Sequence, residues 1–264
     1  EGPVDLVDFI DVSPRQVVGA SSSIIPFLSH DEGNRALMGA NMQCQAVPLV
    51  MPESPVVGTG MEMSIAEGMQ RFTKTLHDGE VTYVDASRIE VKLVKKLKEH
   101  EKKYEDVELV ESGSKEVYYL TKFKRTANST CYNQKVLVEV GQKVKEGEIL
   151  ADGPSVDGGE LALGRNLVIA YASFEGYGFE DAVLISDRLI REDLLTSIHI
   201  EEYEADVVDT KLGPEELTRD IPNVAETDLA NLAEDGIVVI GAEVGPNDIL
   251  VGKIAPKGET ELTA

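Results

Sequence analysis

The sequence has no tryptophan, two cysteines and few aromatic side chains, which make up 5% of its 264 residues. The cysteines, Cys44 and Cys131, form neither a CxxC pair nor any spacing typical of metal ligands. This excludes a disulfide framework and a structural zinc site as organising features of the fold. Such cysteine usage is typical of a reducing compartment, and we expect a cytoplasmic protein.

Long apolar runs are also absent. A membrane-spanning helix needs about 20 consecutive apolar residues, and no stretch of this sequence approaches that length. There is no basic-then-apolar leader either, so we expect neither secretion nor a membrane partner. The chain begins with Glu1 rather than Met and stops at Ala264 without an evident helix end. We therefore expect it to be a piece of a longer protein.

Basic residues are scarce: 25 Lys and Arg stand against 48 Asp and Glu, for a net charge of −23. Because Lys and Arg contact nucleic-acid phosphates, this balance argues against a free-standing nucleic-acid binder. The acidity is concentrated between residues 201 and 235. Such a region is most simply a solvated acidic face, and a docking surface for a basic partner is the alternative.

Short segments separated by turns predict a β-rich mixed fold with few helices. Residues 83–91 indicate a turn between two strands, and the Lys/Glu-rich residues 92–116 indicate either a solvated helix or a hairpin tip. Helices are predicted from Asn34 to Met38, with a turn at Gly39, and within 187–195 and 226–233. Alternation over residues 197–205 predicts an exposed strand.

The clearest internal signal is a repeat. VGQKVKEGEIL at residues 140–150 matches IGAEVGPNDIL at residues 240–250. Each copy has a glycine turn, a central valine, a second turn and then an acid followed by Ile-Leu. The pattern predicts two related small β modules. Carrier modules for biotin or lipoate use similar turns, but neither copy has the exposed tip lysine that they require.

Signatures of nucleophilic catalysis and of nucleotide-binding loops are missing, since no GxSxG, Walker loop or GxGxxG follows a strand. Arg35 remains as a candidate, because its planar guanidinium suits phosphate oxygens, and the amides of Asn41, Gln43 and Gln45 follow it. The plain alternative, favoured by spacing alone, is an ion pair between Arg35 and a local acid such as Asp31 or Glu32.

The adjacent carboxylates Glu180 and Asp181 are the second candidate. They lie where an aromatic, glycine-bearing turn meets an apolar run. Because ionised carboxylates are costly to desolvate, such a pair requires a cation, a hydrogen-bond network or a surface position. Carboxylate oxygens are ligands for divalent metals. On the residues alone, a structural ion pair or a strand-end cap is favoured over a metal site.

Several long segments together resemble the β subunits of bacterial RNA polymerases, in order and nearly end to end. Three of these segments are NRALMGANMQ at residues 34–43, GYGFED at 176–181 and DTKLGPEE at 209–216. Further matches are at residues 25–28, 57–62, 151–155, 159–166, 220–224, 249–253 and 256–260.

The resemblance implies a fold and a domain organisation. Residues 1–60 and 157–203 are expected to form part of a double-psi β-barrel in the hybrid-binding region. Residues 61–156 are expected to form an inserted β module with a Lys/Glu-rich arm. Residues 204–264 are expected to form a truncated base of the flap. The expected class is a β-rich mixed α/β fold with two small sandwich-barrel β modules.

The resemblance also implies an activity, namely template-directed RNA synthesis by a nucleotidyltransferase. In this reaction the RNA 3′-hydroxyl attacks the α-phosphate of an incoming nucleotide and pyrophosphate leaves. Arg35 matches a position near the triphosphate, and Asn41 and Gln45 match positions lining the RNA 3′ end. Glu180 and Asp181 match an acidic pair near the second Mg²⁺.

The implied partners are the β′, α and ω subunits, a sigma factor, the DNA template, the RNA transcript and ribonucleoside triphosphates. The primary Mg²⁺ ligands are expected on β′, so this chain alone is expected to be inactive. Cys44 stands where the family usually has Arg, and a thiol supplies no charged fork to phosphate. The alternative function is a non-catalytic β-barrel module that docks transcription partners.

Overall fold

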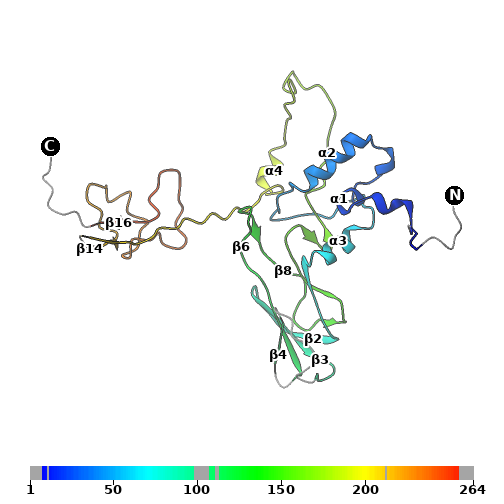
Figure 1. The fold of residues 1–264 in the computed structure, drawn as a ribbon, viewed down its shortest axis with the longest axis horizontal. Helices are drawn as coiled ribbons and strands as arrows, with labels where there is room; N and C mark the ends of the chain where they lie inside the picture. The colour runs from blue at the N-terminus through cyan, green and yellow to red at the C-terminus, as the bar shows by residue number, and fades with distance from the viewer. Residues whose placement is uncertain (1–7, 11, 98–106, 111–112, 212, 256–264) are drawn as a thin grey trace. The chain divides into compact units, whose positions relative to one another are not determined.

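The computed structural model describes residues 8–10, 12–97, 107–110, 113–211 and 213–255. The chain divides into two compact units, residues 1–201 (unit 1) and 202–264 (unit 2). The described residues are rich in short strands and contain few helices (Figure 1), which confirms the predicted β-rich mixed class. No helix among them has both the length and the apolar character to cross a membrane.

The helices of unit 1 are short apart from one. They are η2 (Pro14–Val17), α1 (Ala20–Ser23), η3 (Leu28–His30), α2 (Gly33–Gln43), α3 (Glu62–Gly68) and α4 (Arg188–Arg191). The helix predicted within residues 187–195 is confirmed by α4.

The turn predicted at Gly39 is wrong, because α2 continues through this residue to Gln43. A Cβ built at Gly39 would lie 4.0 Å from Cδ1 of Ile25, and the next residue, Ala40, is buried. Glycine in a helix interior costs about 1 kcal/mol relative to alanine. Packing of this face of α2 against the segment around α1 offsets that cost.

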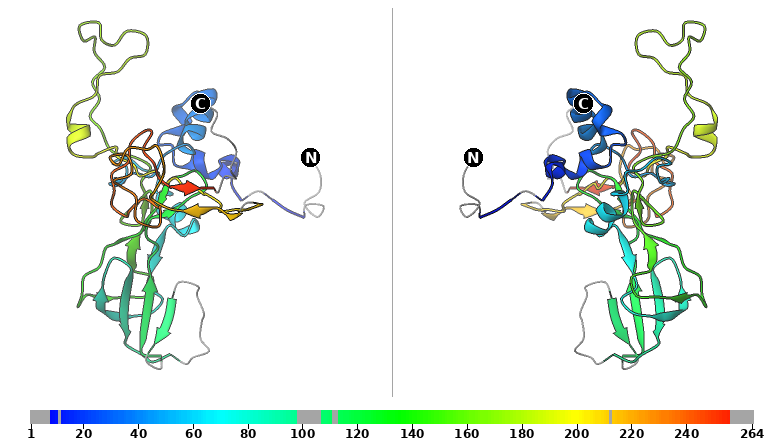
Figure 2. Two further views of the ribbon diagram at one scale, coloured as in Figure 1. Left: turned by 90° about the vertical axis from the view of Figure 1, so that its left-hand side faces the viewer. Right: turned by 90° about the vertical axis from the view of Figure 1, so that its right-hand side faces the viewer.

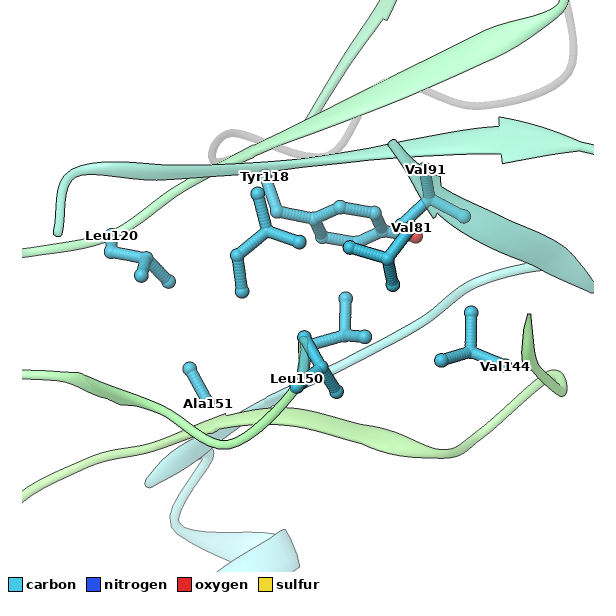
Figure 3. Packing of buried hydrophobic residues seen from close by; sticks show 9 residues of the cluster. Val81, Val91, Tyr118, Leu120, Val144, Leu150 and Ala151 are labelled. Atoms are coloured by element: carbon cyan, nitrogen blue, oxygen red, sulfur yellow. The ribbon is translucent and has the colours of Figure 1, made fainter. Parts of the chain in front are cut away.

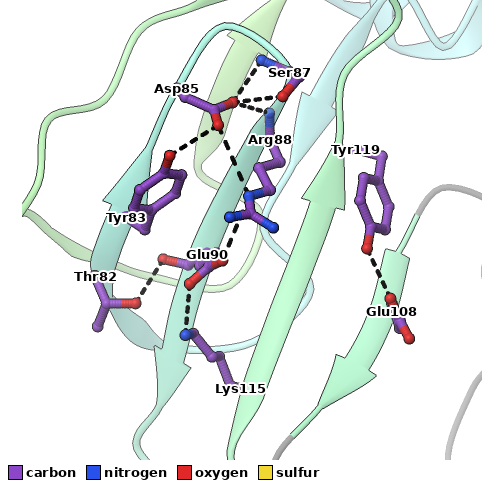
Figure 4. A network of polar contacts seen from close by, with 9 residues as sticks. All are labelled: Thr82, Tyr83, Asp85, Ser87, Arg88, Glu90, Glu108, Lys115 and Tyr119. Atoms are coloured by element: carbon purple, nitrogen blue, oxygen red, sulfur yellow. Dashed lines mark hydrogen bonds and ion pairs between the residues drawn. The ribbon is translucent and has the colours of Figure 1, made fainter.

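A five-stranded antiparallel sheet forms the largest part of unit 1, in the order β4-β5-β3-β2-β9. Its strands are β2 (Gly79–Val84), β3 (Arg88–Leu93), β4 (Val107–Val110), β5 (Lys115–Tyr119) and β9 (Lys143–Val144). The turn predicted within residues 83–91 is confirmed by the β2–β3 hairpin. Asp85 stabilises this turn, as Oδ1 accepts from the N–H groups of Ser87 and Arg88 at 2.7 Å each (Figure 4).

Between β3 and β4, residues 98–106 lie outside the described part of the chain. The prediction of a solvated helix or a hairpin tip over residues 92–116 therefore falls in part outside the described residues, including Lys98, Glu99, Glu101, Lys102 and Lys103.

A second sheet in unit 1 has the order β1-β10-β8, and two small hairpins accompany it. The strands of this sheet are β1 (Phe72–Lys74), β8 (Lys135–Val136) and β10 (Ile149–Asp152). The hairpins are β6 (Lys124–Arg125) with β7 (Cys131–Tyr132), and β11 (Val156–Asp157) with β12 (Glu160–Leu161).

The main hydrophobic core of unit 1 lies between these two sheets. In Figure 3, Tyr118 and Val91 from the five-stranded sheet point toward Leu150 of β10. Leu150, Ala151 and Val91 are fully buried, and Tyr118 is fully buried as well. A second cluster forms where Phe72, Ala66, Val156 and Leu161 meet. The alternation of buried and exposed residues along β3 follows from the two-residue period of a strand.

The two copies of the repeat share their turn geometry. Gly141 and Gly241 have φ of 90° and 93°, and Gly147 and Asn247 have φ of 83° and 75°. In the second turn, Glu148 accepts from the N–H of Lys145 at 3.0 Å, and Asp248 accepts from the equivalent N–H at 2.7 Å. The two turns of the repeat therefore recur in the structure, although the first copy contributes to β9 and β10 and the second copy forms no strand among the described residues.

Among its described residues, unit 2 contains a small hairpin, β13 (Asp209–Thr210) with β14 (Gly213–Pro214). It also contains a long-range antiparallel pair, β15 (Glu216–Leu217) with β16 (Lys253–Ile254). The helix predicted over 226–233 is wrong. Backbone hydrogen bonds in this segment join residues three positions apart, as from the N–H of Leu232 to the carbonyl of Leu229 at 3.1 Å, whereas an α-helix joins residues four apart. Leu232 instead forms a β-bridge with Val238, so long-range pairing prevails over local helix propensity.

The exposed strand predicted over 197–205 is also wrong. Ser197 and His199 make single β-bridges, with Leu49 and Thr130 respectively, and no strand forms there. Each partner segment offers one pairing residue, and a strand requires a continuous ladder.

Residues 165–187 form a loop that extends away from the sheets of unit 1 in all the views (Figures 1 and 2). These residues pair with no strand within the described chain. The assignment of residues 1–60 and 157–203 to one double-psi barrel, of 61–156 to an inserted module and of 204–264 to the base of the flap stays a prediction.

Candidate functional site

Helix α2 carries the first candidate residue. Its N-cap is Glu32, whose Oε2 accepts from the N–H of Arg35 at 3.0 Å, while Oε1 accepts from Nδ2 of Asn34 at 2.7 Å. A carboxylate at this position satisfies helix N–H groups that otherwise lack a partner. The cap therefore sets where the helix begins and leaves the side chain of Arg35 exposed.

The guanidinium of Arg35 has no carboxylate partner in the described part of the chain. Its only hydrogen-bonding neighbour there is Sδ of Met38, 3.6 Å from Nη1. An ion pair with Asp31 or Glu32 was the plain alternative, and it is wrong because Glu32 binds backbone instead. The positive charge of Arg35 is consequently available to an anion.

The amides that follow Arg35 fall on different sides of the helix. Asn41 is exposed, six residues further on, which is roughly 9 Å along the axis at 1.5 Å per residue. Gln45 is exposed just beyond the helix, where its N–H donates to the carbonyl of Met42 at 3.0 Å. Gln43 lies on the packed side, with Oε1 buried, so it is not a candidate for binding a ligand.

Cys44 is the C-cap of α2 and is exposed. Its Sγ lies 3.7 Å from Oγ of Ser21, a neutral contact to the α1 segment. The position that is usually arginine in the resembled family thus carries no charge here.

The second candidate, Glu180 with Asp181, lies in the loop of residues 165–187. Both residues have left-handed backbones, with φ of 52° and 64°. Such values are uncommon outside glycine and indicate a constrained turn. The turn is closed by the N–H of Ala182, which donates to the carbonyl of Phe179 at 3.3 Å.

Both carboxylates of this pair are exposed, and neither makes a hydrogen bond or an ion pair within the described residues. The structural ion pair or strand-end cap that the residues alone favoured is not found among the described residues. The surrounding side chains are unusually apolar for a solvated loop, and Tyr171 is 97% exposed. Exposed large apolar side chains of this loop are Leu167, Val168, Ile169, Tyr171, Phe174, Tyr177, Phe179, Val183, Leu184 and Ile185.

The structure places Arg35 and Asn41 on one helix but brings neither into contact with Glu180 or Asp181. Among the described residues, no group of three His, Cys, Asp or Glu side chains is positioned to hold a metal ion. Two free, adjacent carboxylates fit Mg²⁺ nevertheless, because this ion is often bound by one or two carboxylates together with waters and phosphates. The pair can supply part of a metal site, not a complete one.

Sequence reasoning missed three buried carboxylates, those of Glu62, Glu116 and Asp152. Desolvation raises the pKa of Asp152, although the N–H groups of Gly158 and Gly159 donate to it at 2.7 and 3.0 Å. Nearby glycines could have indicated these two buried carboxylates in the sequence. The backbone N–H of Gly60 donates to Glu62, and those of Gly158 and Gly159 donate to Asp152.

For Glu62, hydrogen bonding affects the pKa more than desolvation does. Desolvation acts to raise its pKa, but the N–H donors of Thr59 and Gly60, at 2.7 and 2.8 Å, outweigh it and the pKa is lowered. Both Glu62 and Asp152 act on backbone rather than on a ligand, so they are structural residues.

Residues 74–264 match the family model described as RNA polymerase Rpb2, domain 6. The whole chain is 53% identical to the DNA-directed RNA polymerase subunit beta of Streptococcus gordonii, and it covers 21% of that protein. It is 55% identical over 260 residues, 98% of its length, to the protein of the same name from Staphylococcus carnosus, again covering 21%. The chain thus spans about a fifth of the length of the curated relatives that it matches.

Proposed function

The chain belongs to the RNA polymerase Rpb2 domain 6 family, and from this membership we propose that it forms part of the catalytic core of a DNA-directed RNA polymerase. The full enzyme would be a nucleotidyltransferase that copies a DNA template into RNA from ribonucleoside triphosphates. Identity above 50% along the whole chain to subunits of that name supports the proposal. Because the chain is a fifth of such a subunit, it would be inactive alone.

In this proposal Arg35 binds the triphosphate of the incoming nucleotide. Its guanidinium is exposed and unneutralised by any carboxylate in the described residues, and an arginine fork suits phosphate oxygens. Asn41 and Gln45 hold the RNA 3′ end, since exposed amides can both donate to and accept from sugar hydroxyls. All three side chains project from α2 or from the turn after it.

Glu180 and Asp181 act at the phosphates of the same nucleotide. A Mg²⁺ ion bound there supplies positive charge that offsets the phosphate charge in the transition state. The carboxylates would hold that ion, directly or through its waters, and their left-handed turn presents them without competing partners among the described residues. The primary ligands of the catalytic Mg²⁺ would belong to another chain of the enzyme.

The partners in this proposal are the β′, α and ω subunits and a sigma factor, in the cytoplasm at the nucleoid. The apolar loop of residues 165–187 supports a multisubunit setting, because exposed apolar surface of this kind is typical of a segment that other protein covers.

The observation that carries the proposal is the adjacent carboxylate pair, without a protein partner among the described residues, in a chain more than half identical to polymerase subunits. The test is Glu180→Gln with Asp181→Asn in the assembled full-length polymerase. We expect nucleotide addition to slow by about 10–100-fold, which is the typical cost of removing groups that support a metal site. The loss should be largest at low Mg²⁺ and should shrink as Mg²⁺ is raised.

A matched control removes two charges nearby, Glu175→Gln in the same loop with Glu192→Gln in α4's C-cap. This control should leave the rate of addition within about twofold of the unaltered enzyme. Equal rates for the Glu180/Asp181 variant and the control at every Mg²⁺ concentration would show that the role assigned to the pair is wrong.

A further inference from the structure

The sequence contains six methionines, and the side chains of all six are exposed in the structure. They are Met38, Met42, Met51, Met61, Met63 and Met69. Methionine is among the residue types that are most often buried, so a set that is exposed throughout is unusual. An accessible thioether can be oxidised to the sulfoxide, which turns an apolar side chain into a polar one. The surroundings of each sulfur decide whether this modification has a consequence.

Met38 is set apart by the contact that its sulfur makes. Sδ lies 3.6 Å from Nη1 of Arg35, which precedes Met38 by three residues on the same face of α2. Among the described residues, no other methionine sulfur accepts a hydrogen bond from a side chain, and no other side chain accepts one from this guanidinium. A thioether is only a weak acceptor, so the guanidinium keeps nearly all of its capacity to bind an anion.

Oxidation of Met38 would turn this weak contact into a strong one. An oxygen bonded to a sulfur that lies 3.6 Å from Nη1 can approach the guanidinium to the ordinary N–H···O distance of about 2.9 Å. A hydrogen bond from an ionised donor is roughly twice as strong as one between neutral groups. The guanidinium N–H groups that face Met38 would then be occupied by the sulfoxide instead of being open to phosphate oxygens.

We propose that Met38 is an oxidation site that controls whether Arg35 can bind phosphate, with hydrogen peroxide as the oxidant. The lone pair of Sδ forms a bond to one peroxide oxygen, and the O–O bond breaks. The departing hydroxide takes the proton of the transferred oxygen and leaves as water, so the sulfur loses two electrons and the peroxide gains them. Methionine sulfoxide reductases reverse the modification. The effect on nucleotide binding rests on the proposed function of Arg35, whereas the contact between sulfoxide and guanidinium does not.

The same helix supplies a matched comparison. The side chain of Met38 is 50% exposed, so peroxide can reach its sulfur. Met42, one turn further along α2, is 63% exposed, but it makes no hydrogen bond to a cation within the described part of the chain. Oxidation of Met42 would therefore add a polar group to α2 without occupying Arg35. The two methionines differ mainly in the presence of the guanidinium.

The first measurement follows the labelling of Arg35 by phenylglyoxal, a reagent for accessible guanidinium groups, in the assembled full-length polymerase. The enzyme is treated with hydrogen peroxide, then with catalase, and then with dithiothreitol, which restores oxidised thiols such as that of the exposed Cys44. Peptide mass spectrometry quantifies the sulfoxide at Met38 and the label at Arg35. We expect oxidation to slow the labelling about tenfold, the effect of one hydrogen bond to a charged group.

The second measurement is the apparent KM for ribonucleoside triphosphates. In the unaltered polymerase, KM should rise about tenfold after peroxide with kcat changed less than about twofold, and it should return after treatment with methionine sulfoxide reductases. Met38→Leu, which nearly conserves side-chain volume, should keep its KM through the treatment. Met42→Leu should respond as the unaltered enzyme does. Each variant is compared with its own untreated sample.

Three results would overturn the proposal. These are labelling of Arg35 that oxidation of Met38 leaves unchanged, a KM that rises equally in Met38→Leu, and a Met38 that peroxide spares while it converts Met42. Arg35→Gln without peroxide tests the proposed function separately. An unchanged KM for that variant would show that Arg35 does not bind the nucleotide, and the labelling would still decide whether the sulfoxide occupies the guanidinium.

Discussion

The hydroxyl of Tyr118 donates a 2.6 Å hydrogen bond to Oε2 of Glu116, two residues earlier on the same face of β5. The same hydroxyl accepts from the N–H of Leu76 at 2.8 Å. Oε1 of Glu116 lies 2.8 Å from Nδ1 of His77. Both Tyr118 and Glu116 are buried, so this network satisfies a carboxylate and a backbone donor inside the core. It joins the five-stranded sheet to the segment between β1 and β2.

Replacing Tyr118 with Phe should destabilise the chain by about 1–3 kcal/mol, because the N–H of Leu76 and one oxygen of Glu116 would remain buried without a partner. The measurement is urea unfolding followed by circular dichroism. Tyr119→Phe is the control, since its hydroxyl donates to Glu108 at an exposed site. It should change the free energy of unfolding by less than about 0.5 kcal/mol. Similar values for the two variants would contradict a core role for the Tyr118–Glu116 bond.

The β2–β3 turn should lose stability in acid. Hydrogen bonds from the hydroxyl and N–H of Ser87 lower the pKa of Asp85 to about 2, and the N–H of Arg88 and the hydroxyl of Tyr83 add to the effect (Figure 4). A carboxyl group with a lowered native pKa stabilises the fold above its unfolded pKa, and this contribution is lost as the pH falls through the native value.

The corresponding experiment compares thermal melting of the unaltered chain with Asp85→Asn from pH 7 to pH 2. Asparagine keeps an oxygen acceptor but does not titrate, so the unaltered chain should melt a few degrees higher at pH 5–7. That difference should shrink between about pH 4 and pH 2. A difference that stays constant over this range would mean that ionised Asp85 does not stabilise the turn.

The repeat makes a prediction about backbone strain. Gly147 has φ of 83°, and the equivalent Asn247 has φ of 75°. Gly147→Ala should destabilise the chain by about 1–2 kcal/mol, because a Cβ disfavours the left-handed region. Asn247→Gly should be neutral or slightly stabilising, since glycine adopts this conformation freely.

Gly68→Ala serves as the control for this pair, because Gly68 is the last residue of α3 and a Cβ there meets nothing within 4 Å. Urea unfolding of the three variants checks the prediction. If Gly147→Ala unfolds like Gly68→Ala, the left-handed turn is not the feature that the two copies of the repeat share.

Features that depend on neighbours in the chain could be predicted from the sequence. The β2–β3 turn, helix α4 and the two turns of the repeat all follow from short-range patterns of glycine, acidic and apolar residues. The same is true of the candidate positions Arg35, Glu180 and Asp181, whose motifs lie in continuous segments. A local turn or cap is stabilised by hydrogen bonds between residues a few positions apart, so the residue types that form it can be recognised in the sequence.

The tertiary structure alone decided which side chains meet. It carried α2 through Gly39 by packing against Ile25, and it replaced the helix expected at 226–233 with a bridge between Leu232 and Val238. It placed the carboxylate of Glu32 on backbone N–H of α2, so the guanidinium of Arg35 has no carboxylate partner among the described residues. It also buried Glu116 beside Tyr118. Each outcome depends on long-range burial, whose free energy exceeds the small local propensities that a sequence pattern expresses.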